Sequence, residues 1–297
     1  MDCAVRRLVL LILVLYTART TAAQNFDTVQ VRTTALGKGV YMLAGAGGNM
    51  GLSVGDDATF LIDDEFAPLT PKIRAAIAAL TPKPVRFVLN THWHFDHTGG
   101  NKDHGDAGAL IVAHDNVRKR LSAGQLIAAL NRIESSAPKS ALPVVTFNDT
   151  ATFHINGDDV VAFHVAPAHT DGDVIVFFRA ANVVHMGDVF LSAGFPFVDL
   201  SSGGSVNGII AACDRVLPVI DAATKVIPGH GPLADRSRVK AYRDMLFVVR
   251  DRMRKEILAR HTIDAVLAST ITAEYDASWP GGRERFLRLL FQELSGK

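Results

Sequence analysis

The chain has 297 residues, of which 48% are hydrophobic and 21% charged, a composition typical of a globular protein rather than a disordered one. Its formal net charge is +1, so a basic surface for nucleic acid is not expected. Eleven histidines accompany only two cysteines, which excludes a disulfide framework and thiolate-rich metal sites. Any metal would therefore be held by imidazole and carboxylate groups.

The first 23 residues predict a secretory signal peptide. Two arginines precede the apolar run Leu8 to Tyr16, and small residues precede the expected cleavage point after Ala23. The run covers about half of the roughly 20 apolar residues that span a bilayer, so a cleaved leader is favoured over a permanent membrane anchor. We expect a signal peptide at 1–23, a mature domain at 24–297, and a periplasmic or secreted protein.

After the leader, β-branched runs alternate with helical stretches, and no linker marks a domain boundary. Thr70 is expected to cap a helix with Pro71 at its first position, and a buried strand, Val85 to Leu89, should follow that helix. Before this helix the sequence predicts an antiparallel meander of four strands: Val29 to Thr33, Gly39 to Leu43, Gly51 to Val54 and Thr59 to Ile62.

The second half repeats this plan and ends in a long amphipathic helix from about Asp235 to Ala259. Because sheets are followed by helices in both halves, we predict a single α/β domain, a four-layer αββα sandwich of two face-to-face sheets with outer helices. The strands expected here are Thr150 to Ile155, Val160 to Val165, Val174 to Phe178, Val183 to Met186 and Lys225 to Ile227.

Four potential metal ligands lie within six residues directly after the strand at 85–89. They are His92, His94, Asp96 and His97. Residues at i and i+2 of an extended segment point the same way, so His92 and His94 can hold one metal while Asp96 and His97 face a second. Three histidines and an aspartate crowded at a strand end predict a metal site, and their spacing suits two ions.

Three further strand ends deliver candidate ligands in the same manner. His169, Asp188 and His230 each follow a predicted strand by a few residues. Such loops gather in space although they are distant in sequence. Taken singly, His169 could be a turn residue, Asp188 a helix cap and His230 a solvent-exposed imidazole.

With these motifs the sequence resembles the metallo-β-lactamase superfamily, from about Phe26 to beyond His230. The segment 92–97 is similar to the family's H-x-H-x-D-H motif. The segments 168–173, 186–188 and 228–231 are similar to its third-histidine, bridging-aspartate and last-histidine motifs. The resemblance implies two zinc ions: His92, His94 and His169 would bind the first, Asp96, His97 and His230 the second, and Asp188 would bridge them.

Three imidazoles with water in the fourth position would form an open, catalytic zinc site, so hydrolysis is the expected chemistry. A metal-bound hydroxide would attack a carbonyl group, and Asp96 would orient it and pass a proton. The expected partner is a small-molecule substrate, without nucleic acid or a membrane anchor after leader cleavage; the oligomeric state stays open. Met50, Phe195 and Phe197 are expected to form an apolar rim around the metals, although the two phenylalanines could instead pack their loop on the core.

The best expectation for the substrate is a β-lactam, opened with modest efficiency. Zinc β-lactamases similar in motif order carry Cys at the position of Asp188 and Lys at the position of Leu191, where the cation pairs with the antibiotic carboxylate. Losing a charge-assisted contact of about 1.5 to 3 kcal/mol should weaken lactam binding. Asp188 is instead similar to the bridging residue of glyoxalase II-like thioesterases, lactonases and phosphodiesterases, which are the alternative. A non-catalytic zinc-binding protein is the alternative from another class.

Overall fold

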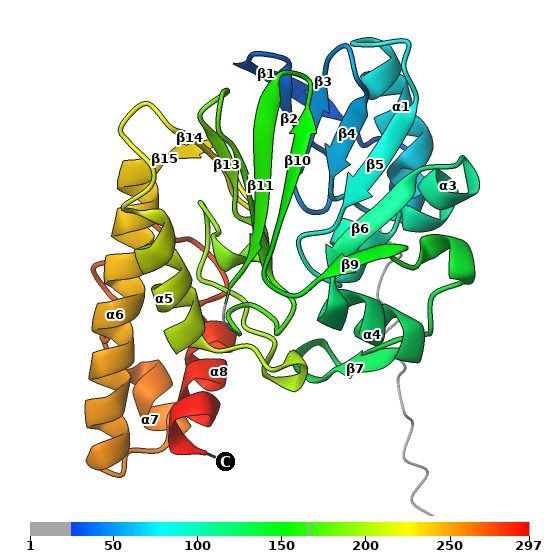
Figure 1. Cartoon of the computed structure of the whole chain (residues 1–297). Coiled ribbons are helices and arrows are strands. Elements are labelled where there is room, and N and C mark those ends of the chain that lie inside the picture. The colour runs from blue at the N-terminus through cyan, green and yellow to red at the C-terminus, as the bar shows by residue number, and fades with distance from the viewer. Residues whose placement is uncertain (1–24, 166, 297) are drawn as a thin grey trace, which may run out of the picture.

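The structure is a computed structural model that describes residues 25–165 and 167–296; the expected leader and its cleavage point lie outside these residues. Two β-sheets face each other between outer helices (Figure 1), which is the predicted four-layer αββα arrangement. Within the described ranges, no helix is both long and apolar enough to cross a membrane.

The first sheet has seven strands in the order β1-β2-β3-β4-β5-β6-β9. Its first four strands form the expected antiparallel meander, and β5, β6 and β9 then add in parallel. The strands are β1 (Arg32–Gly37), β2 (Val40–Ala44), β3 (Met50–Val54), β4 (Thr59–Ile62), β5 (Val85–Leu89), β6 (Leu110–His114) and β9 (Val145–Phe147).

The second sheet has six strands in the order β10-β11-β12-β13-β14-β15, and only the β13–β14 pair is parallel. A separate two-stranded hairpin lies in the sequence between β6 and β9 of the first sheet and consists of β7 (Gln125–Ile127) and β8 (Arg132–Glu134). The strands of the second sheet are β10 (Thr150–Ile155), β11 (Asp158–His164), β12 (Val174–Phe178), β13 (Val183–His185), β14 (Lys225–Ile227) and β15 (Ala234–Asp235).

Helices follow both sheets. The longest, α6, begins after Asp235, whose side chain accepts a hydrogen bond from the backbone N–H of Arg238 and so caps the helix. The α-helices are α1 (Thr70–Ala78), α2 (Phe95–Thr98), α3 (Asn101–Asp106), α4 (Asp115–Ala123), α5 (Val206–Val216), α6 (Arg236–Leu258), α7 (Ile263–Ala268) and α8 (Arg283–Ser295). Short 3₁₀ helices are η1 (Ala67–Leu69), η2 (Ala128–Leu130), η3 (Lys139–Ala141), η4 (Gly187–Val189) and η5 (Leu200–Ser202).

Three apolar layers hold the sandwich together. Alternate side chains of both sheets, such as Phe60 and Phe178, are fully buried between the sheets. The other face of the first sheet packs against α1 through Ile73 and its neighbours. The other face of the second sheet packs against α5, α6 and α8, where Tyr242 and Phe286 are buried. The two sheets are therefore rigid supports for the loops at their strand ends.

Two expectations about the first half were wrong in detail. The first strand begins at Arg32 rather than Val29, because Val29 packs against the outer cluster beside α1 instead of pairing in the sheet. Thr70 is the first helical residue and makes no capping hydrogen bond, since η1 runs directly into α1 and moves the cap to Leu69. The remaining predicted strands lie within one or two residues of those observed.

Candidate metal centre

The seven predicted ligands come together in space. One strand of the first sheet, β5, leads into the segment that carries four of them, and three strands of the second sheet lead to the others: β11 to His169, β13 to Asp188 and β14 to His230. Three overlapping groups of ligand atoms each lie within 4.8 Å of one another: His92, His94 and His169; His92, His97 and Asp188; Asp96, His97 and His230. The site thus joins both halves of the sandwich.

The first group is a buried triangle of imidazoles. Nδ1 of His94 lies 2.8 Å from Nε2 of His169, and the ring of His92 stands nearly perpendicular to both, with centroids 4.9 and 4.6 Å away. Nε2 of His92 is buried without a hydrogen-bond partner among the described residues. A buried polar atom without a partner is costly, and a metal ion held by the three facing nitrogens would remove that cost.

The second group opens to solvent. Nε2 of His97 lies 3.4 Å from Nε2 of His230, which lies 3.3 Å from Oδ2 of Asp96. The side chain of His97 is fully buried, whereas those of His230 and Asp96 are 32% and 19% exposed. A small molecule can therefore reach the centre on the side of these two residues.

Asp188 lies between the two groups. Its Oδ1 is 3.1 Å from Nε2 of His97, and its Oδ2 is 3.4 Å from Nε2 of His230 and 3.6 Å from Nε2 of His169. One carboxylate thus faces a nitrogen of the first group and two nitrogens of the second. This is the arrangement expected of a ligand shared by two cations.

The electrostatics differ between the two groups. Burial lowers the pKa of His92 well below its usual value and that of His169 to about 4, so both imidazoles keep a free lone pair near neutral pH. Burial also acts on His230, but Asp188 and Asp96 outweigh it and raise the pKa of His230 to about 10. The end of the site around Asp188 therefore favours positive charge.

Residues that the sequence interpretation missed orient the imidazoles. Asp63, at the end of β4, is fully buried and accepts hydrogen bonds from Nδ1 of His97 at 2.8 Å and from the hydroxyl of Thr91 at 2.7 Å. Because that hydroxyl donates to Asp63, it can accept from Nδ1–H of His92 at 3.1 Å, which leaves Nε2 of His92 as the ligand atom.

The other two imidazoles of the first group have partners as well. Nε2 of His94 lies 3.0 Å from Oδ2 of Asp199, and Nδ1 of His169 lies 2.8 Å from the backbone oxygen of Phe197. A hydrogen-bond acceptor on the second nitrogen is usual for metal-binding histidines, because it fixes the tautomer and the ring orientation.

A tight turn between β2 and β3 ties the two halves of the centre together. The Asn49 amide donates to the backbone oxygens of Pro228 and Gly231, both at 2.9 Å, on either side of His230. The preceding Gly48 lies so close to His97 that a Cβ atom there would be 2.1 Å from Cε1 of the imidazole. The turn therefore holds the His230 loop and packs directly on His97.

Of the three residues expected to form an apolar rim, only Phe197 lies against the predicted ligands, and it is buried in an apolar cluster with Trp93 and Leu289. Its ring lies 5.9 Å from that of His94 and 5.7 Å from that of His169. Met50 is not at the rim: strand alternation turns it into the outer core of the first sheet, where it is fully buried. Phe195 is also wrong as a rim residue, because it is buried and stacks on Phe286 of α8 at 5.5 Å.

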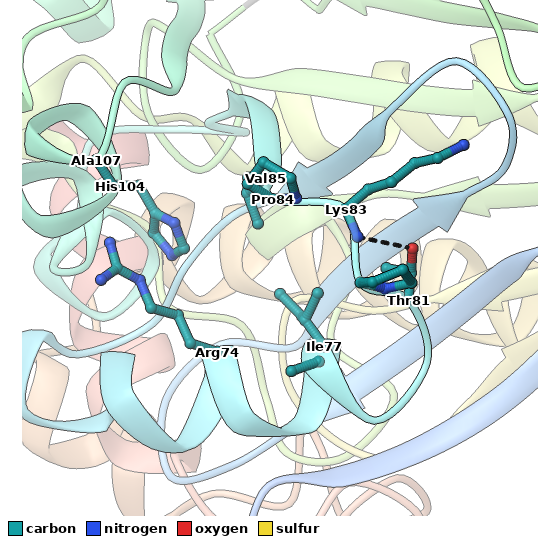
Figure 2. Close-up of a pocket in the computed structure, with 10 residues that line it drawn as sticks. Arg74, Ile77, Thr81, Lys83, Pro84, Val85, His104 and Ala107 are labelled. Carbon is teal, nitrogen blue, oxygen red and sulfur yellow. Dashed lines mark hydrogen bonds between the residues drawn. The ribbon is translucent and has the colours of Figure 1, made fainter.

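A separate cavity of about 320 Å³ lies on the outer side of the first sheet, between α1 and α3. Arg74 and His104 lie at one end of it and Lys83 near the other (Figure 2). None of the seven ligands lines this cavity. It is therefore distinct from the metal centre.

The fold and the site together define a metallohydrolase of the αββα class, and comparisons identify the family. A family profile for the metallo-beta-lactamase superfamily matches residues 44–246. The chain belongs to this superfamily. No significant match was found among curated proteins.

Solved structures share the fold at low sequence identity. A metallo-beta-lactamase from Pontibacter korlensis is 21% identical with a TM-score of 0.61, and the match covers 73% of this chain and 99% of that one. The metallo-beta-lactamase FIM-1 from Pseudomonas aeruginosa, in a mono-zinc form, is 21% identical with a TM-score of 0.59, and the match covers 73% of this chain and 95% of that one. The sec-alkylsulfatase Pisa1 from Pseudomonas sp. is 16% identical with a TM-score of 0.68, and the match covers 88% of this chain and 50% of that one. The chain is thus similar in fold to proteins with different substrates.

Proposed function

We propose that the protein is a binuclear zinc hydrolase. The position of Asp188 carries this proposal, because its two oxygens face nitrogens of both ligand groups. The donor set fits zinc: the first group is three imidazoles, and carboxylates add negative charge at the second. The buried, unpartnered Nε2 of His92 is further support, since it lacks any other partner among the described residues.

Zinc bound here would activate a water molecule near neutral pH and polarise the carbonyl group next to the bond that is cleaved. His92, His94 and His169 would hold one ion, Asp96, His97 and His230 the other, and Asp188 both. Asp96 has the additional role of a proton acceptor: its side chain is 19% exposed, so its carboxylate reaches the open side of the centre. Asp63 and Asp199 keep the imidazoles in position through their second nitrogens.

For the substrate, we propose a β-lactam opened with modest efficiency. The open side at His230 and Asp96 admits a small molecule, and a strained amide is susceptible to attack by an activated water. Leu191 stands where the similar lactamases carry a lysine. It is only 9% exposed, and its backbone pairs with that of His230 in an isolated parallel β-bridge. It supplies no charge for an antibiotic carboxylate, which is why modest turnover is expected.

The second candidate is an ester-type substrate, either a lactone, a thioester or a phosphodiester. The observation in its favour is the carboxylate of Asp188 at the bridging position, together with the apolar Leu191. A non-catalytic zinc-binding protein is disfavoured, because the side of the centre at His230 and Asp96 is accessible rather than closed by protein.

A hydrolysis panel separates these functions. Purified zinc-loaded protein would be assayed with a chromogenic cephalosporin, an acyl-homoserine lactone, a thioester and a phosphodiester, with Asp96→Asn as the inactive control. Lactam turnover that is lost in the control supports the proposal. Fast lactone or thioester hydrolysis without lactam turnover would select the second candidate, and zinc binding without any turnover would favour a binding protein.

We also propose that the protein is exported and cleaved after Ala23, because a charged start, an apolar run and small residues precede that point. Measurement of the intact mass of protein purified from its native host tests this. A mass equal to that of a chain beginning at Gln24 agrees with export, whereas retention of Met1 or a cytosolic location would contradict it.

A further inference from the structure

A cation from outside the family-matched region lies beside the metal centre. Helix α8 begins at Arg283, well beyond residue 246, where the family profile ends. The guanidinium carbon of Arg285 on this helix lies 4.9 Å from the ring centroid of Phe197. That ring in turn contacts the imidazoles of His94 and His169. The same aromatic ring therefore lies close both to the cation and to two imidazoles of the first ligand group.

The position of Arg285 is fixed by the packing of α8. Phe286 stacks on Phe195 of the loop that leads to Phe197, and Leu289, one turn after Arg285, packs in the same apolar cluster as Phe197. Near its end, Glu293 accepts hydrogen bonds from the hydroxyl of Ser205 and the backbone of the next residue, at the start of α5. The helix (red in Figure 1) is thus anchored to the loops around the centre at several points.

Arg285 differs from the neighbouring cations because no polar or acidic group among the described residues pairs with its charge. Across residues 25–165 and 167–296, its guanidinium group has no hydrogen bond and no ion pair, and the residue is exposed. The other arginines near the site are engaged: Arg120 pairs with Asp171, Arg132 with Glu134, and Arg238 donates to the backbone oxygens of Ser192 and Ser278. An aromatic face holds Arg285 in place without neutralising it.

We propose that Arg285 forms an anion-binding subsite, so that substrates of this enzyme carry a carboxylate on the side of Phe197, in addition to the bond that is cleaved. This inference rests on the proposed metal centre, which would hold the reacting end of the same molecule. Arg285 would take over, from a different element, the charge that Leu191 does not provide. A planar guanidinium can bind a carboxylate through two parallel hydrogen bonds, which also orients the substrate.

Binding of thiol probes tests the subsite without turnover. Unbranched mercaptocarboxylic acids of increasing chain length would be compared by calorimetry with their neutral carboxamides on the zinc-loaded protein. The thiolate binds zinc in both series, so only the acids report a cation at a distance. We expect one chain length at which the acid binds about tenfold more tightly than the amide, and a smaller ratio at high salt.

Variants assign that preference to Arg285. Arg285→Met retains the stem on the ring but removes the charge and should bring the acid-to-amide ratio close to one. Arg285→Lys should keep part of it. Arg288→Met is the matched control: it removes a cation from the same helix that already pairs with Glu284, and the ratio should not change.

Two results would overturn the subsite alone, and a third would overturn the proposed function as well. Equal binding of acids and amides by the unaltered protein would overturn it, as would a ratio that survives in Arg285→Met. If neither series binds, the bound zinc has no position open to a substrate, so the proposed hydrolase function fails together with the subsite; failure of the proposed function is thus distinguished from failure of this inference.

Discussion

Asn49 joins the two halves of the metal centre, and its removal is expected to destabilise the whole domain. Its amide donates two hydrogen bonds, each 2.9 Å long, to backbone oxygens 179 and 182 residues away, and the side chain is buried. Each bond contributes on the order of 1 kcal/mol, and the oxygens of Pro228 and Gly231 lose buried donors at a further cost. Asn49→Ala should therefore lower the free energy of unfolding by about 2 to 4 kcal/mol.

Urea unfolding of the zinc-loaded protein measures this effect. With a slope of about 3 kcal/mol per molar urea, the midpoint should fall by roughly 1 M. Asn207→Ala is the control, because both contacts of this asparagine on α5 are exposed to solvent: its amide lies 3.5 Å from Glu293, and its oxygen accepts a hydrogen bond of 3.1 Å from Arg250. Its loss should change the stability by less than about 0.5 kcal/mol. If both variants unfold at the same urea concentration as the unaltered protein, the turn does not clamp the His230 loop.

The remaining predictions concern the ligand packing, the substrate anchor and the free thiol. Gly48→Ala places a Cβ against the imidazole of His97, which Asp63 holds from the other side, so binding of the second zinc should weaken more than tenfold by titration; unchanged affinity would contradict that contact. Leu191→Lys should lower the KM for carboxylate-bearing lactams but not for neutral esters, and equal effects on both would remove the anchoring argument. Burial raises the pKa of the Cys213 thiol to about 12, so iodoacetamide at pH 8 should modify it only after denaturation, as peptide mapping would show; rapid labelling of the native protein would mean that α5 opens.

The ligand set could be predicted from the sequence because its chemistry is local. His92, His94, Asp96 and His97 are crowded into one segment, and the other candidates each follow a recognisable strand. Strand periodicity also placed β4, β5, β12 and β14 at their observed residues. Local patterning works here because alternation and strand ends are properties of a few neighbouring residues.

What could not be predicted depends on contacts between distant segments. Asp63 orients His97 from 34 residues upstream, and its only local signal is an acid just after a buried strand, which resembles the weaker signal of Asp188 a few residues after its own strand. Asp199 has no such signal. The sequence misplaces Met50 because this residue directly follows the glycine-rich segment 45–48 and the neighbouring Asn49, a pattern typical of a loop, whereas Met50 is already the first residue of β3. Phe195 was misplaced because nothing near it in sequence indicates that α8 covers it.

The zinc content of the protein tests the central claim most directly. Native mass spectrometry of chelator-free protein in excess zinc should show two ions per chain, and Asp188→Ala should reduce the occupancy because one carboxylate faces both ligand groups. Arg288→Met is the control and should retain two ions, because Arg288 pairs with Glu284 on α8. Asp173→Asn would not serve, since the Asp173 side chain accepts a hydrogen bond from the backbone of His169. A single zinc that persists in excess metal, unaffected when Asp96, His97 and His230 are each replaced by Ala, would contradict the binuclear centre.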